Sequence, residues 1–163
     1  MNESTRTERI IAAVAHVVSL VAVIPYFVGY TLIPSGPIWV GGLALNAGIT
    51  LAAWTRSPYV TRHAAQAALW VLAAYLTEVL AFLFFVVAVL FGVGFSLRDG
   101  TFTDGALAGY NAEVLARVAL ALVFFAIPCC CAYQAFRGRA CRVPLIGFVV
   151  GLITPAARQV KQP

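Results

Sequence analysis

The chain has 163 residues, of which 62% are hydrophobic and only 10% are charged. A soluble domain carries about 25% charged residues, so a water-soluble fold of this size cannot bury this much apolar surface. The composition indicates a single integral membrane domain, and the net charge of +5 does not indicate nucleic-acid binding because the basic residues sit at the ends of apolar runs.

Four apolar runs are long enough to cross a bilayer core of about 30 Å as helices, and they predict an all-α, four-helix membrane bundle. The runs cover residues 10–33, 38–54, 64–95 and 112–136. A fifth run, residues 143–153, reaches only about 16 Å at 1.5 Å per residue. We expect this last segment to lie at the membrane interface or to insert halfway.

The third helix is expected to begin before its apolar run. Ser57 suits the N-cap, and Pro58 suits the first helical position. A helix from Pro58 to Phe95 would be about 57 Å long, which exceeds the bilayer core. We therefore expect its first two turns to lie at the cytoplasmic interface, with Arg62 reaching lipid phosphates and the alanines facing inward.

The basic residues are unequally divided between the two sides of such a bundle. One side carries Arg6, Arg9, Arg56, Arg62, Arg137, Arg139, Arg142, Arg158 and Lys161, and the other carries Arg98 alone. The positive-inside rule then places both termini in the cytoplasm. This predicts a cytoplasmic N-terminus (residues 1–9), a four-span domain (residues 10–155) and a cytoplasmic tail (residues 156–163).

Three ionisable residues, His16, Glu78 and Arg117, and the neutral Asn46 fall inside these runs. A charge at mid-helix costs about 2.5–3.5 kcal/mol on insertion scales, so each ionisable residue is a functional candidate. Glu78 is an expected neighbour of Arg117 if the third and fourth helices are adjacent, although Glu113 lies one turn from Arg117. The alternatives are a structural ion pair or a path for protons or ions.

Small residues recur every four positions on the second helix, at Ala44, Gly48 and Ala52. Such a face favours close packing, either within the bundle or between copies of the chain. The four cysteines, three of them consecutive at 129–131 and one at 141, do not have zinc-ligand spacing. We interpret them as small packing residues with reduced thiols, and we expect no metal or cofactor.

The stretch "SPYVTRHAAQAAL", which holds Ser57, Pro58, His63 and Gln66, resembles the signature of a bacterial family of small membrane proteins with no established function. That family is similar to the four-helix channel-candidate subunit of the chloroplast Tic translocon. "AAVAHVVSLVAVIP" resembles its first helix, and "AYQAFRGRACRVPLIG", with Gly138, Arg142 and Pro144, resembles its tail. Many relatives have Asn where this chain has Trp70.

The resemblance implies a bacterial inner-membrane location and, through the Tic likeness, a role in protein translocation. The sequence has no catalytic motif, and its two histidines are 47 positions apart, so we expect no enzyme. Two functions remain: a scaffold or translocation component working through helix–helix contacts, or a conductor of ions, protons or small solutes through His16, Glu78 and Arg117. The expected partners are membrane lipids and either a second copy or another membrane protein.

Overall fold

The computed structural model describes residues 4–27, 35–90, 95–96, 101–102, 104–141, 143 and 145–153. Within these ranges the regular structure is helical apart from two short antiparallel strands, Phe95–Ser96 (β1) and Thr101–Phe102 (β2). The helices are α1 (Arg6–Phe27), α2 (Ser35–Ala53), α3 (Pro58–Leu90), α4 (Asp104–Phe136) and α5 (Ile146–Ile153). The all-α prediction is therefore confirmed.

Three of the described helices contain a segment long and apolar enough to cross a membrane. These segments are Arg6–Ile24, Pro58–Ala81 and Val118–Phe136. The second apolar run forms a shorter apolar helix, Pro37–Ala53. The membrane class and the multi-pass character follow from these lengths and compositions.

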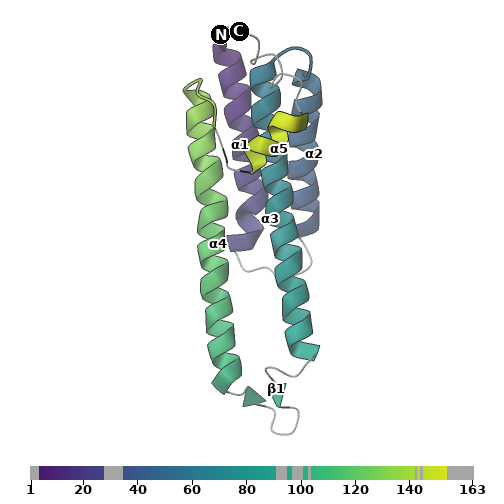
Figure 1. Cartoon of the computed structure of the whole chain (residues 1–163), viewed down its shortest axis with the longest axis vertical. Helices are drawn as coiled ribbons and strands as arrows, with labels where there is room; N and C mark the ends of the chain where they lie inside the picture. Colours follow the sequence, from purple (N-terminus) through teal and green to yellow (C-terminus); the bar gives the residue numbers. More distant parts are fainter. Residues whose placement is uncertain are drawn as a thin grey trace.

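The four long helices alternate in direction (Figure 1). The start of α1, the end of α2, the start of α3 and the end of α4 lie at one end of the molecule, and α3 and α4 extend beyond α1 and α2 at the other. The predicted Glu78–Arg117 pair required the third and fourth helices to be adjacent, but α4 packs mainly along α1. The backbones of α3 and α4 make little contact in the described residues. Instead, the side chains of Tyr59 and Trp70 on α3 hydrogen-bond to backbone carbonyls of α4.

The ends of the helices follow local sequence signals. Thr5 and Glu8 form a capping box, in which Thr5 N donates to Glu8 Oε2 (2.7 Å) and Glu8 N donates to Thr5 Oγ1 (3.2 Å). Ser57 accepts from Val60 N through its Oγ (3.2 Å), which confirms the predicted N-cap of α3. Gly138, with φ of 74°, ends α4 in a left-handed conformation that glycine adopts without strain.

An apolar layer joins α1 to α2, α3 and α4 near the middle of the bundle. Its buried members are Ala22, Val23, Trp39, Val71, Ala74 and Phe124. Beside this layer, α2 passes close to α1 at Gly42, where an added Cβ would lie 2.7 Å from Ala22 Cβ. This glycine therefore sets the spacing between α1 and α2.

The small-residue face of α2 does not pack inside the bundle. Ala44, Gly48 and Ala52 are exposed, and a Cβ added at Gly48 would meet nothing within 4 Å. The interpretation as an intramolecular packing face is wrong, because α2 turns Trp39, Gly42 and Asn46 toward its neighbours instead. In a lipid-facing helix both sides are apolar, so small residues alone do not indicate which side is inward.

The short C-terminal helix α5 packs against α3. With 8 residues it is about 12 Å long, which is far less than a bilayer core. Val150 is buried, whereas Phe148 and Leu152 are 69% and 62% exposed. An apolar helix that shows large side chains outward suits contact with lipid at an interface, as the sequence predicted for this segment.

Candidate functional site

Polar side chains are buried together in the half of the bundle that contains the start of α1 and α3. The buried set is His16, Ser19, Asn46, Ser57, Thr61, His63 and Gln66. They come from α1, α2 and the first turns of α3. Buried polar groups in an apolar environment must be hydrogen-bonded to be tolerated, so their partners define what this region does.

The two histidines are hydrogen-bonded to each other. His16 Nε2 lies 3.1 Å from His63 Nδ1, and the rings meet edge to face with centroids 5.3 Å apart. Both side chains are almost fully buried, with 3% and 1% of their surface exposed. We expected the two histidines to lie apart because they are 47 positions apart in the chain, and this expectation is wrong.

The donor and acceptor roles of the two ring nitrogens depend on the tautomers of the histidines. When both rings are neutral, one donates its N–H and the other accepts. The two imidazoles therefore form a buried donor–acceptor contact between α1 and α3.

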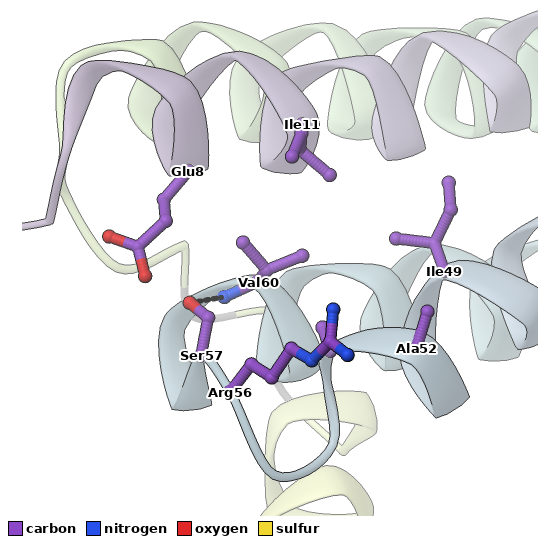
Figure 2. Close-up of a pocket in the computed structure, with 8 residues that line it drawn as sticks. Glu8, Ile11, Ile49, Ala52, Arg56, Ser57 and Val60 are labelled. Atoms are coloured by element: carbon purple, nitrogen blue, oxygen red, sulfur yellow. Dashed lines mark hydrogen bonds between the residues drawn. The ribbon is translucent and has the colours of Figure 1, made fainter.

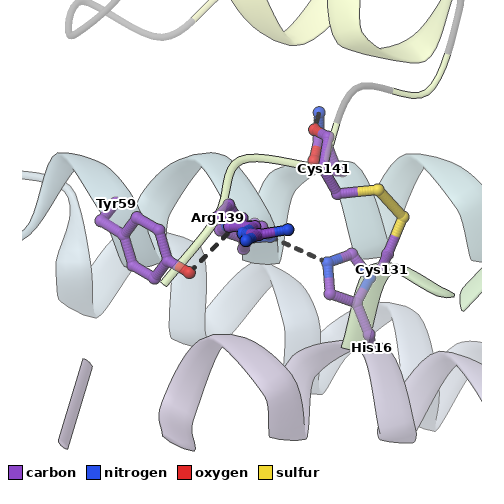
Figure 3. Close-up of a disulfide and its surroundings, with 7 residues drawn as sticks. His16, Tyr59, Cys131, Arg139 and Cys141 are labelled. Carbon is purple, nitrogen blue, oxygen red and sulfur yellow. Dashed lines mark hydrogen bonds between the residues drawn. A yellow bond between two sulfur atoms is a disulfide. The ribbon is translucent and has the colours of Figure 1, made fainter. Parts of the chain in front are cut away.

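The segment after α4 closes over this pair (Figure 3). Tyr59 Oη donates to the carbonyl of Ala135 (2.7 Å), and its ring packs against His63 with centroids 4.7 Å apart. Gln66 Nε2 donates to the carbonyl of Cys141 (3.1 Å). The start of α3 thus binds the end of α4 and the chain that follows it through side-chain to backbone bonds.

A disulfide fixes the same segment. Cys131 and Cys141 are bonded, with their Cα atoms 5.2 Å apart, and only 2% and 5% of their surfaces are exposed. Cys129 and Cys130 are free thiols. The expectation that all four cysteines are reduced is wrong for this pair, because the turn at Gly138 brings Cys141 back alongside α4.

A second part of the polar layer joins three helices at Ser19. Asn46 Nδ2 donates to Ser19 Oγ (3.2 Å), and this hydroxyl lies within hydrogen-bond distance of the carbonyls of Ala67 (3.1 Å) and Ala15 (3.2 Å). The contact to Ala67 crosses from α1 to α3, and the contact from Asn46 crosses from α2 to α1. One hydroxyl therefore ties α1, α2 and α3 together.

Trp70 also forms a cross-helix bond. Its Nε1 donates to the carbonyl of Phe124 (3.1 Å), and the two rings pack with centroids 5.1 Å apart. The indole thus links α3 to α4 just below the polar layer. An asparagine donor at this position would supply a hydrogen bond without the ring packing.

At the start of α3, polar side chains point inward together with the alanines, whereas only the alanines were expected to face inward. His63 and Gln66 are buried, Tyr59 is half-buried against α4, and Arg62 is partly exposed. Ala64, Ala65 and Ala67 are buried, as expected. The polar residues face inward because they have partners there: His16, Arg139 and Cys141.

The remaining predicted residues lie elsewhere. Glu78 is half-buried on α3, four turns beyond His63. Arg117 lies within α4, but its side chain and that of Glu113 fall outside the described residues, as do Arg142 and Pro144. The predicted pairing of Glu78 with Arg117 stays a prediction.

Comparison with known protein families, with curated proteins and with solved structures finds no match. The candidate site therefore has to be judged on its own chemistry. Among the described residues, no serine or cysteine is hydrogen-bonded to either histidine, so no activated nucleophile is assembled there. Those residues also contain no group of three or more metal-ligating side chains.

Proposed function

We propose that this chain is a non-enzymatic, four-span scaffold of the bacterial inner membrane that works through helix–helix contacts, with both termini in the cytoplasm. The fourth span is α2, whose 19 residues reach about 28 Å, close to the thickness of a bilayer core. The distribution of arginine and lysine supports the orientation. The Tic resemblance supports a role near protein translocation.

The observation that carries the scaffold proposal is that the buried polar layer joins different segments of the fold to one another, although Asn46 Oδ1 and Gln66 Oε1 have no hydrogen-bond partner among the described residues. The His16–His63, Asn46–Ser19 and Gln66–Cys141 bonds each join two different segments of the fold. Such bonds fix the rotation and depth of helices, because an unmatched polar group in an apolar interior is costly. Side chains committed in this way support a rigid platform more than a moving part.

The surface offered to a partner is then the outside of the bundle. The exposed face of α2, with Ala44, Gly48 and Ala52, lets another helix approach closely, and it accommodates a second copy or another membrane protein. A scaffold with this face would hold its partner through backbone proximity and packing.

A conductor remains the second candidate, because the His16–His63 hydrogen bond has the donor–acceptor form of a proton relay. A conducting path needs polar groups in succession. The layer next to the histidines toward the other end of the bundle is mostly apolar, with Val23, Val71 and Phe124. Its polar side-chain atoms are the indole Nε1 of Trp39 and, beside it, that of Trp70, which already donates to the carbonyl of Phe124. This favours the scaffold over the conductor.

Photocrosslinking in native membranes tests the proposal. A photoreactive residue at Gly48, on the outward face of α2, should give a discrete adduct with another membrane protein or a second copy. The matched control is Leu80, which is 65% exposed on α3 and should give mainly lipid adducts. Equal adduct patterns at both positions would contradict the use of α2 as the contact face.

Proton flux in liposomes separates the two candidates. The purified protein should leave an imposed pH gradient intact at the rate of empty liposomes. A gradient that collapses with the wild-type protein but persists with His63→Phe would overturn the scaffold in favour of the conductor.

A further inference from the structure

A groove opens between the start of α1, the end of α2 and the start of α3 (Figure 2). It has a volume of about 370 Å³. Its walls are the apolar side chains of Ile11, Ile49, Ala52 and Val60. No residue of the buried polar network other than Ser57 lines it, so the groove is separate from the histidine site.

Two opposite charges stand at the edge of this apolar groove. Glu8, on α1, is held by Thr5, whose N and Oγ1 lie 2.7 and 3.1 Å from Glu8 Oε2. Arg56, in the turn between α2 and α3, is exposed and forms no side-chain hydrogen bond or ion pair to any described residue. The groove therefore offers a fixed carboxylate, an available guanidinium and an apolar wall.

The position of the groove matches the depth of lipid headgroups. It lies where α1 and α3 begin and α2 ends, at the ends of the candidate membrane segments. Trp54, which is 39% exposed, stands two residues before Arg56 in the same turn. Tryptophan and arginine at a helix end are typical of the membrane–water interface.

We propose that this groove binds one phospholipid whose headgroup carries a primary amine, that is, a lipid of the phosphatidylethanolamine class. Its phosphate is bound by Arg56, its ammonium by Glu8, and the upper part of an acyl chain packs on Ile11, Ile49 and Val60. A guanidinium matches a phosphate, and an ammonium donates hydrogen bonds to a carboxylate.

The charge pair selects among common headgroups. An anionic glycerol headgroup would have no cation to place on Glu8, and like charges placed together are unfavourable. A choline headgroup keeps the charge but has no N–H to donate, and its usual recognition by several aromatic faces is not provided by the residues that line this groove.

Native mass spectrometry of the detergent-purified full chain tests this assignment with ethanolamine, choline and glycerol phospholipids of the same acyl chains. The ethanolamine lipid should bind about tenfold more tightly than the other two, as expected for one charge-assisted hydrogen bond of about 1.4 kcal/mol. Soluble phosphoethanolamine at the same concentration should not compete, because it lacks the acyl chain. Equal binding of the ethanolamine and choline lipids, preference for the glycerol lipid, or competition by phosphoethanolamine would each overturn the proposal.

Variants separate the two charges. Glu8→Gln keeps the N3 role in the capping box, so the helix start is preserved while the carboxylate charge is lost. It should abolish the preference for ethanolamine over choline, whereas Arg56→Gln should weaken both lipids. Arg6→Gln, an exposed residue outside the groove, should change neither. Unchanged selectivity in Glu8→Gln, or an equal effect of Arg6→Gln, would contradict the site.

A variant that fills the groove tests whether the lipid binds there, independently of the charge substitutions. Ala52 is exposed, so Ala52→Trp occupies the groove without entering the core. The variant should elute as a single species and lose the bound ethanolamine lipid. A well-folded Ala52→Trp that keeps the lipid would place the lipid elsewhere.

Discussion

Replacing Ser19 by alanine removes the one hydroxyl that joins α1, α2 and α3. Two cross-helix hydrogen bonds are lost, from Asn46 Nδ2 and to the carbonyl of Ala67. Such bonds contribute about 0.6 kcal/mol each in membrane proteins, and a buried donor left without a partner costs about 1–3 kcal/mol. Since Asn46 is fully buried, we expect Ser19→Ala to lower the free energy of unfolding by about 2–4 kcal/mol.

The effect of Asn46→Leu on the free energy of unfolding should have opposite signs in the wild-type and Ser19→Ala backgrounds. Asn46→Leu in the wild-type chain loses one hydrogen bond and should destabilise the protein by up to about 1 kcal/mol. In the Ser19→Ala background the same substitution removes a stranded amide and should restore at least about 1 kcal/mol. Two apolar groups facing each other are tolerated better than one polar group facing none.

The assay is reversible unfolding of the purified protein in mixed micelles of mild detergent and dodecyl sulfate. Thr77→Val is the matched control, because the Thr77 hydroxyl donates only to Ala73 of its own helix (2.8 Å). It should change the free energy of unfolding by less than about 0.5 kcal/mol. Equal effects of Ser19→Ala and Thr77→Val, or an Asn46→Leu effect of the same sign in both backgrounds, would refute the reasoning.

Three further predictions address the fold and its orientation. Joint replacement of Cys131 and Cys141 by serine should lower the free energy of unfolding by roughly 2.7 kcal/mol, the chain-entropy value for a separation of 10 residues. Cys130→Ser should leave the free energy of unfolding unchanged. Thiol titration of the denatured wild-type protein should find two thiols before reduction and four after it. Gly138→Ala should lower the melting temperature, because φ is 74° and the new Cβ would lie 3.1 Å from Arg9 Nε, whereas Gly48→Ala should leave it unchanged. A fluorescent reporter fused after Lys161 should fold and fluoresce, as expected for a cytoplasmic tail, and an active periplasmic phosphatase fusion at the same site would contradict the orientation.

The proposed cytoplasmic orientation favours reduced thiols at the end of the molecule where the disulfide lies. Cytoplasmic thiols are kept reduced, yet the proposed orientation would place Cys131 and Cys141 on that side. Burial of both sulfurs limits the access that thiol–disulfide exchange requires. Thiol titration after rapid acid quenching of intact cells should therefore find the pair oxidised; a reduced pair would show that burial does not protect it.

The approximate positions of the helices were predictable because they depend on local signals, but α4 begins at Asp104, eight residues before the predicted run 112–136, and Phe95, expected within the third helix, lies in β1. Ser57 and Pro58 fixed the start of α3, and run length separated α5 from the spanning helices. Gly138 lies just after the fourth apolar run, and a glycine in that position is a recognised signal for the end of a helix. We did not use this signal to predict where α4 ends. The Thr5–Glu8 capping box was also readable in the sequence.

The contacts between side chains were harder to predict from the sequence, because they depend on how each helix is rotated about its axis. His16 and His63 both lie within three turns of the same end of the bundle, and that depth was the available signal for their contact. The sequence does not show in which direction each histidine side chain points around its helix axis, because lipid-facing and buried positions are both apolar. The same ambiguity made the exposed Gly48 face resemble a packing face.

Nuclear magnetic resonance of the protein with ¹⁵N-labelled histidine tests the buried polar layer most directly. The chain has only 2 histidines, so every imidazole nitrogen signal belongs to His16 or His63. A hydrogen bond of 3.1 Å between His16 Nε2 and His63 Nδ1 predicts a nitrogen–nitrogen correlation across the bond, and His16→Phe should abolish it. Two histidines that show no correlation, and a His63 spectrum unchanged by His16→Phe, would contradict the account.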